Sequence, residues 1–101
     1  MDEARLRVDF NEMIENNLVL LSKQDTKIDS KGNTIHLKEG LEIKIYEEDF
    51  DENNNPDNLI AEGKVELNTY KDKYSWTSAC KWNCRINSTG IKNISQLKNG
   101  R

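Results

Sequence analysis

The chain lacks any long apolar run. A membrane-spanning helix would need about 20 consecutive apolar residues, and no segment of this 101-residue sequence has them. The amino terminus, MDEARLRVDF, alternates charged and apolar residues, and it has no uninterrupted hydrophobic run of the kind found in a secretory signal. We therefore expect a cytoplasmic protein that makes no contact with a membrane.

Residues that commonly carry out catalysis are also scarce. The chain has one histidine, His36, and the alternation in segment 34–37 puts it on the opposite face from Ile35 and Leu37. A glycine-rich phosphate loop and a G-x-S-x-G nucleophile motif are both missing. The sequence therefore predicts a protein that is not an enzyme and that needs no cofactor.

Two cysteines are present, Cys80 and Cys84. If both lie on one strand, their α-carbons are about 13 Å apart, roughly twice the reach of a disulfide. A metal site would need about four ligands, and His36 and scattered carboxylates are the residues that could complete one. We expect two reduced, buried thiols and no metal site.

Charge is abundant and unevenly distributed. Charged residues make up 33% of the chain, and the net charge is −3. Residues 42–66 carry nine acids and two bases, whereas residues 67–101 carry seven bases and one acid. The middle and the end of the chain are therefore electrostatic opposites, and the net charge argues against a general polyanion binder.

Alternation of apolar and polar residues is the strongest structural signal. It is typical of strands with one buried face, and turns containing Gly and Asn separate the segments. The expected strands are 6–10, 18–21, 41–46, 59–67 and 76–86, with a small hairpin formed by 26–28 and 34–37 and a short strand or helical turn at 91–94. At most a short helical turn is expected near 11–17. The pattern predicts one all-β domain over residues 1–101, a small antiparallel barrel of five to six strands, with an SH3-like strand order favoured over an OB-like one.

The clearest alternation runs through segment 76–86. Both tryptophans and both cysteines of the chain share one parity there, in the set Trp76, Ser78, Cys80, Trp82, Cys84 and Ile86. Side chains of one parity lie on one face of a strand. We expect this face to be buried and to build the core rather than to perform chemistry.

A long acidic segment connects the expected strands 41–46 and 59–67, and it is the first candidate binding site. Connections of this length are often functional, and a basic protein surface is the expected partner. The candidate residues are Glu47, Glu48, Asp49, Asp51, Glu52 and Asp57. A protein of this kind would be a small regulator or inhibitor.

Oxygen-bearing side chains at alternating positions in segment 49–57 are also typical of calcium-binding loops. Asn54, however, stands where an EF-hand loop has glycine, and Ile60 stands where it has a bidentate glutamate. The flanking segments are expected strands rather than helices. A solvated acidic hairpin loop is therefore favoured over a cation site.

Single-stranded nucleic acid is the alternative partner, on a face near residues 70–85. Cationic side chains can follow phosphates, and tyrosine rings can stack on bases. The candidate residues are Tyr70, Lys71, Lys73, Tyr74, Lys81 and Arg85. Glu62 and Glu66 of the preceding expected strand would lie opposite or diagonal to Lys81 and Arg85 and neutralise them. Protein binding is therefore favoured over nucleic-acid binding.

Overall fold

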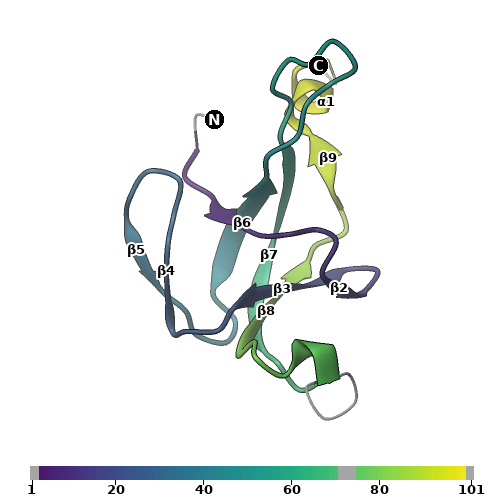
Figure 1. Cartoon of the computed structure of the whole chain (residues 1–101). Coiled ribbons are helices and arrows are strands. Elements are labelled where there is room, and N and C mark those ends of the chain that lie inside the picture. Colours follow the sequence, from purple (N-terminus) through teal and green to yellow (C-terminus); the bar gives the residue numbers. More distant parts are fainter. Residues whose placement is uncertain (1–2, 71–74, 100–101) are drawn as a thin grey trace.

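Short strands are the main regular structure of the described chain, which is residues 3–70 and 75–99 of a computed structural model (Figure 1). The strands are β1 (Leu6–Arg7), β2 (Met13–Glu15), β3 (Leu18–Ser22), β4 (Thr26–Ile28), β5 (Thr34–His36), β6 (Glu42–Glu47), β7 (Leu59–Leu67), β8 (Trp82–Ile86) and β9 (Lys92–Asn93). The helical segments are a 3-10 turn, η1 (Ser75–Thr77), and a short helix, α1 (Ile94–Asn99). The all-β class is confirmed.

The main sheet has the strand order β1-β6-β7-β8-β3-β2, and β9 also pairs with β7. It curls into a half-barrel, and β4 and β5 form a separate hairpin beside it (Figure 1). The pairs are antiparallel as expected, except that β1 runs parallel to β6, with Leu6 beside Ile45. A parallel pair needs a long connection, and here strands β2 to β5 lie within it. The N-terminal strand therefore pairs with a strand from the middle of the chain.

No helical turn forms near 11–17, where at most a short one was expected. Strand β2 lies there instead and pairs antiparallel with β3, with Met13 beside Val19. The Asp9 carboxylate accepts the Asn11 amide at 2.8 Å, so the polar residues before β2 form a turn and not a helix cap. Met13 packs against the apolar core. Pairing with β3 therefore prevails over the weak local preference for helix.

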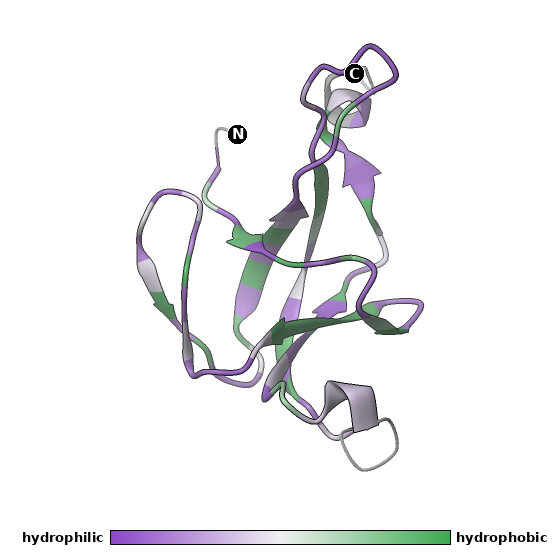
Figure 2. Cartoon of the chain, viewed as in Figure 1, coloured by the Kyte–Doolittle hydropathy of each residue, from purple (hydrophilic) through white to green (hydrophobic). Residues whose placement is uncertain are grey.

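One apolar core collects side chains from β1, β3, β6, β7 and β8, together with Leu37 from the connection after β5. Apolar segments lie on the strands, and the connections are largely hydrophilic (Figure 2). The alternation predicted for β6 is confirmed, because Ile43 and Ile45 are buried while Glu42 is exposed. Strand β3 does not alternate, because its four residues Leu18–Leu21 are all buried.

The strand expected over 76–86 begins at Trp82, so half of that prediction is wrong. The predicted burial is confirmed for Cys80, Trp82, Cys84 and Ile86. Trp76 and Ser78 are exposed instead. Trp76 lies in η1, with 54% of its surface exposed.

Asn68 explains why residues 75–81 leave the extended conformation. Its side-chain amide donates to the Thr77 carbonyl at 3.1 Å and to the Cys80 carbonyl at 2.9 Å. Both carbonyls therefore accept hydrogen bonds from one side chain and do not need the backbone amides of a neighbouring strand. Asn83, on the parity expected to face solvent, is fully buried and donates to Asn68 Oδ1 at 3.3 Å. Hydrogen bonds of the buried Asn68 and Asn83 side chains therefore take the place of strand pairing in the first half of the expected strand.

Candidate functional site

The acidic loop, defined as residues 47–57, continues the β6–β7 hairpin. The Asp57 amide donates to the Asp49 carbonyl at 2.8 Å, and Phe50 forms a bridge with Pro56. At the tip, Asp51 Oδ1 accepts the amides of Asn53 and Asn55, each at 2.9 Å. An aspartate that accepts the amides of the residues after it closes a tight turn. The loop is therefore an ordered hairpin.

Asn54 completes this tip. Its φ of 64° lies in the left-handed region, which asparagine tolerates better than most residues. Its amide donates to the Asp51 carbonyl at 2.9 Å. The three consecutive asparagines at 53–55 therefore serve the turn through their backbone conformations and amides.

The base of the acidic loop is tied to the C-terminal segment. Asp57 accepts the Ser95 amide at 3.0 Å and the Ser95 hydroxyl at 2.7 Å. The Asn93 side chain donates to the Asp57 carbonyl at 2.8 Å and to Asp49 Oδ2 at 3.3 Å. The loop and α1 thus lie together at one end of the molecule (Figure 1). Two of the six predicted acids, Asp49 and Asp57, hold the loop in place.

The start of α1 is itself capped. The Asn93 amide donates to Gln96 Oε1 at 2.7 Å, which is one half of a capping box. Asp57 satisfies the next free amide, that of Ser95. The short helix is therefore held by side chains at its first turn.

The remaining acids have different environments. Glu47 is half-buried and accepts the Phe10 amide at 3.2 Å, and Glu48 forms a surface ion pair with Arg7 at 3.3 Å. Asp51 and Glu52 are exposed at the tip. The structure thus brings the predicted residues into one hairpin, but it presents Glu48, Asp51 and Glu52 to solvent more fully than the other three.

Phe50 is the feature that the sequence interpretation missed. It lies between Asp49 and Asp51 in the acidic loop and is 56% exposed. A single aromatic residue within a run of acidic and amide side chains was the available signal. Exposed aromatic side chains are frequent anchors of protein interfaces.

The acidic carboxylates do not converge on a cation site. Among the described residues, no group of three or more His, Cys, Asp or Glu side chains is placed to hold a metal ion. Asp51 is directed at backbone amides and Asp57 at Ser95. The carboxylates of this hairpin organise the chain itself.

On the alternative surface, Arg85 is held by carboxylates. Its guanidinium binds Glu66 through two bonds, of 3.0 and 3.1 Å, and it also binds Glu15 at 2.9 Å. The predicted pairing of Arg85 with Glu66 is confirmed. These bonds, the one to Glu66 first, raise the pKa of Arg85 above its ordinary value. Tyr70 donates its hydroxyl to the same Glu15 at 3.0 Å.

Lys81 is also engaged, though with another partner than the one expected. Its ammonium lies 2.7 Å from Asp25, not beside Glu62. Asp25 accepts the indole N–H of Trp82 at 2.9 Å as well. The Lys81 ammonium, with help from the Trp82 indole, lowers the pKa of Asp25. Lys71, Lys73 and Tyr74 lie outside the described residues, so the nucleic-acid surface stays a prediction.

The two thiols are buried and the histidine is exposed, so they do not share one environment. Cys80 and Cys84 are free and buried, whereas His36 on β5 is exposed. Cys80 Sγ lies 3.0 Å from the Trp82 carbonyl and 3.2 Å from the Ser22 carbonyl. Burial raises the pKa of the Cys84 thiol to about 12. A thiol of this kind is a weak nucleophile at neutral pH because the thiolate is the reactive form.

No family model, curated protein or solved structure matches this chain. Within the described residues, no helix is long and apolar enough to cross a membrane.

Proposed function

We propose that this protein is a non-catalytic interaction module, of the small regulator or inhibitor type, that binds a basic surface of a partner protein through its acidic loop. The observation that carries the proposal is the exposure of Phe50 on a hairpin whose turn and base are held by internal hydrogen bonds. Asp51, Asp57 and Ser95 supply these bonds.

Preorganisation supports this proposal. A loop that is ordered before binding loses less conformational entropy when it docks, so more of the contact energy appears as affinity. The tip and the base of the acidic loop are both closed by hydrogen bonds. The partner would therefore bind a loop whose conformation is fixed before binding.

The chemistry of the exposed residues defines the partner. Phe50 would enter an apolar pocket, as aromatic anchors do at interfaces. Glu48 and Glu52 would face lysine or arginine side chains at the rim, where charge mainly accelerates association and selects the partner. A basic surface with an apolar depression is the expected counterpart.

The test uses the variant Glu48→Gln/Phe50→Ala/Glu52→Gln, which alters exposed residues and keeps the hydrogen bonds that hold the turn and the base of the loop. It removes one exposed ion pair, that of Glu48 with Arg7. A matched control, Glu12→Gln/Ile28→Ala/Glu39→Gln, loses the same charge and one exposed apolar side chain elsewhere on the surface. Both are immobilised beside the wild type at low and high salt, and the captured proteins are quantified by mass spectrometry. Amide spectra establish that all three chains are folded.

We expect partners that the wild type and the control retain and that the loop variant loses. Their recovery should also fall as salt rises, because rim charges are screened. Equal recovery by the loop variant and the control would remove the acidic loop from consideration as the binding surface.

A further inference from the structure

Strand β6 has an edge that is only partly covered. On one side it pairs with β7 along its whole length, from Glu42 to Glu47. On the other side β1 covers two positions, with Leu6 beside Ile45 and Arg7 beside Tyr46. Within the described chain, no strand pairs with that side of β6 from Glu42 to Lys44.

Hydrogen-bond directions show which backbone groups this edge presents. The Val8 amide donates to the Tyr46 carbonyl at 2.9 Å, so the backbone amide and carbonyl of Tyr46 point away from β7. Backbone direction alternates along a strand, so Lys44 and Glu42 face the same way. Among the described residues, the amide and carbonyl of Glu42 and the amide of Lys44 have no hydrogen-bond partner. The edge therefore offers three adjacent backbone groups.

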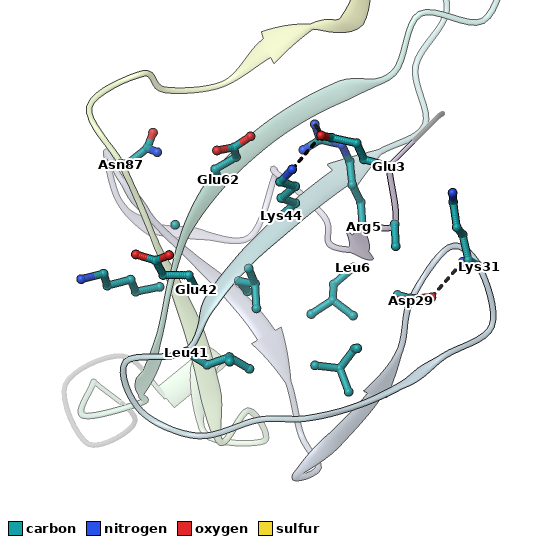
Figure 3. Close-up of a pocket in the computed structure, with 15 residues that line it drawn as sticks. Glu3, Arg5, Leu6, Asp29, Lys31, Leu41, Glu42, Lys44, Glu62 and Asn87 are labelled. Carbon is teal, nitrogen blue, oxygen red and sulfur yellow. Dashed lines mark hydrogen bonds and ion pairs between the residues drawn. The ribbon is translucent and has the colours of Figure 1, made fainter.

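The uncovered edge borders a cleft of about 800 Å³ (Figure 3). Its far wall belongs to the β4–β5 hairpin and the connection after it, and the segment before β1 closes one end. On the side of β6 the cleft extends to β7 and to the turn after β8, where Glu62, Gly63, Lys64 and Asn87 line it. Apolar side chains from both walls line the interior: Leu6, Ile35, Leu41 and Ile43. Exposed sheet edges are usually charged, short or covered. This one is short and carries Glu42 and Lys44, but apolar side chains lie beside it in the cleft. We name this cleft the β6 seam.

The two walls decide what fits. A second copy of this chain would bring a whole sheet to the edge, and the β4–β5 hairpin stands where that sheet would continue. A single extended segment needs the width of one strand, about 4.8 Å from β6. It would form the hydrogen bonds that Glu42 and Lys44 leave open.

We propose that the β6 seam binds an extended segment of a partner protein, which adds to β6 as an antiparallel strand. This is strand addition, in which backbone bonds supply affinity and alternate side chains supply specificity. It concerns a surface separate from the acidic loop and does not depend on the function proposed above.

Charge and polarity of β6 define the order of residues in that segment. Directly opposed residues of an antiparallel pair lie on the same face. The residue opposite Ile43 faces the apolar lining and is apolar. The residue opposite Glu42 is basic, because Glu42 is exposed and has no ion pair among the described residues. The residue opposite Lys44 is acidic and takes the place of Glu3, which binds Lys44 at 2.8 Å when the seam is empty.

Read from its amino end, the segment is therefore acid, apolar, base. Strand β1 occupies the row beyond Lys44, with Leu6 beside Ile45. The segment must begin or turn away there, while its carboxyl end can continue past Glu42.

The probe is a capped peptide, Glu-Val-Lys-Val-Thr, and the control is Lys-Val-Glu-Val-Thr, which has the same composition in reversed charge order. Titration into labelled full-length protein should shift the amide resonances of Glu42 and Lys44 and slow their hydrogen exchange. The control peptide should bind about fivefold more weakly, because both cross-strand pairs become like-charged.

A charge-reversed variant, Glu42→Lys, gives an independent reading. It should weaken the first peptide and strengthen Glu-Val-Glu-Val-Thr, while the amide spectrum away from β6 stays that of the wild type. Unchanged exchange at Glu42 and Lys44, equal binding of the two ordered peptides, or shifts confined to the acidic loop would overturn the proposal. Protection that rises with protein concentration in the absence of peptide would assign the edge to a second copy of the chain instead.

Discussion

At the scale of single residues, Gly63 allows β7 and β8 to approach each other. A Cβ atom at this position would overlap the Arg85 carbonyl oxygen and would lie 3.0 Å from Cys84 Sγ. Backbone cannot move aside as a flexible side chain can, and overpacking of this kind costs about 1 to 3 kcal/mol or more. We expect Gly63→Ala to lower the urea midpoint accordingly.

The control for this substitution is Glu62→Ala, on the same strand. Glu62 is exposed, and exposed substitutions change the free energy of unfolding by about 0.5 kcal/mol or less. A Gly63→Ala protein with the urea midpoint of the wild type would contradict this prediction, because β7 and β8 would then make room for the methyl group at no cost in the free energy of unfolding.

Cys84 makes stability depend on alkaline pH. Burial, with a contribution from the Glu66 carboxylate, raises the pKa of its thiol from 9.0 to about 12. The folded state therefore holds the proton that the unfolded chain loses first. This contribution to stability is complete below pH 9 and is lost as pH rises from 9 toward 12.

We expect the urea midpoint of the wild type to fall more steeply between pH 9 and 11 than that of Cys84→Ala, since pH 9 is the ordinary pKa of this thiol. Other groups titrate in both proteins, so the difference between the two slopes isolates Cys84. Parallel slopes would contradict the assignment.

At the scale of elements, the acidic loop and α1 should behave as one unit. Asp57→Ala removes both bonds to Ser95. Loss of a side chain that caps a helix typically costs about 0.5 to 2 kcal/mol. We expect faster hydrogen exchange at the Ser95 amide and shifted resonances in the loop, with the exchange of β7 and β8 unchanged. Glu52→Ala is the control, and equal exchange at Ser95 in both variants would contradict the coupling.

The elements also show what alternation can and cannot predict. Strand β6 was predicted well because it places apolar residues at every second position. The bounds of β7 were predicted too, but its alternation is wrong at two positions, since Ile60 is buried and Leu67 is 44% exposed. The interpretation of segment 76–86 placed Trp76 wrongly because parity carries no information about a side chain 9 to 12 residues away that competes for carbonyls. Asn68 does so, and its bonds to Thr77 and Cys80 replace strand pairing. The acidic loop was likewise located from composition, but its bonds to Ser95 depend on β9 lying beside β7.

At the scale of the whole molecule, pairing partners follow from packing rather than from local pattern. Leu6 was expected in a strand, and it is in one, but its parallel pairing with Ile45 depends on how the sheet curls. The β6 seam follows from the same arrangement, because β1 begins only at Leu6, beside Ile45, and leaves the β6 edge from Glu42 to Lys44 uncovered by a strand. A sequence pattern identifies strands, whereas the neighbours of each strand determine where an edge is free.

The contact of β1 with β6 should matter for the stability of the whole sheet. Leu6 is 2% exposed and packs in the core where β1 meets β6. Truncating a buried leucine to alanine costs about 2 to 5 kcal/mol, a large share of the roughly 5 to 15 kcal/mol that stabilises a typical domain. We expect Leu6→Ala to lower the urea midpoint strongly and to speed exchange of the Tyr46 amide, which faces β1. Arg7→Ala, an exposed neighbour on the same strand, should change stability by about 0.5 kcal/mol or less. If the two substitutions proved equally mild, β1 would be an appendage of the sheet and not the strand that closes it.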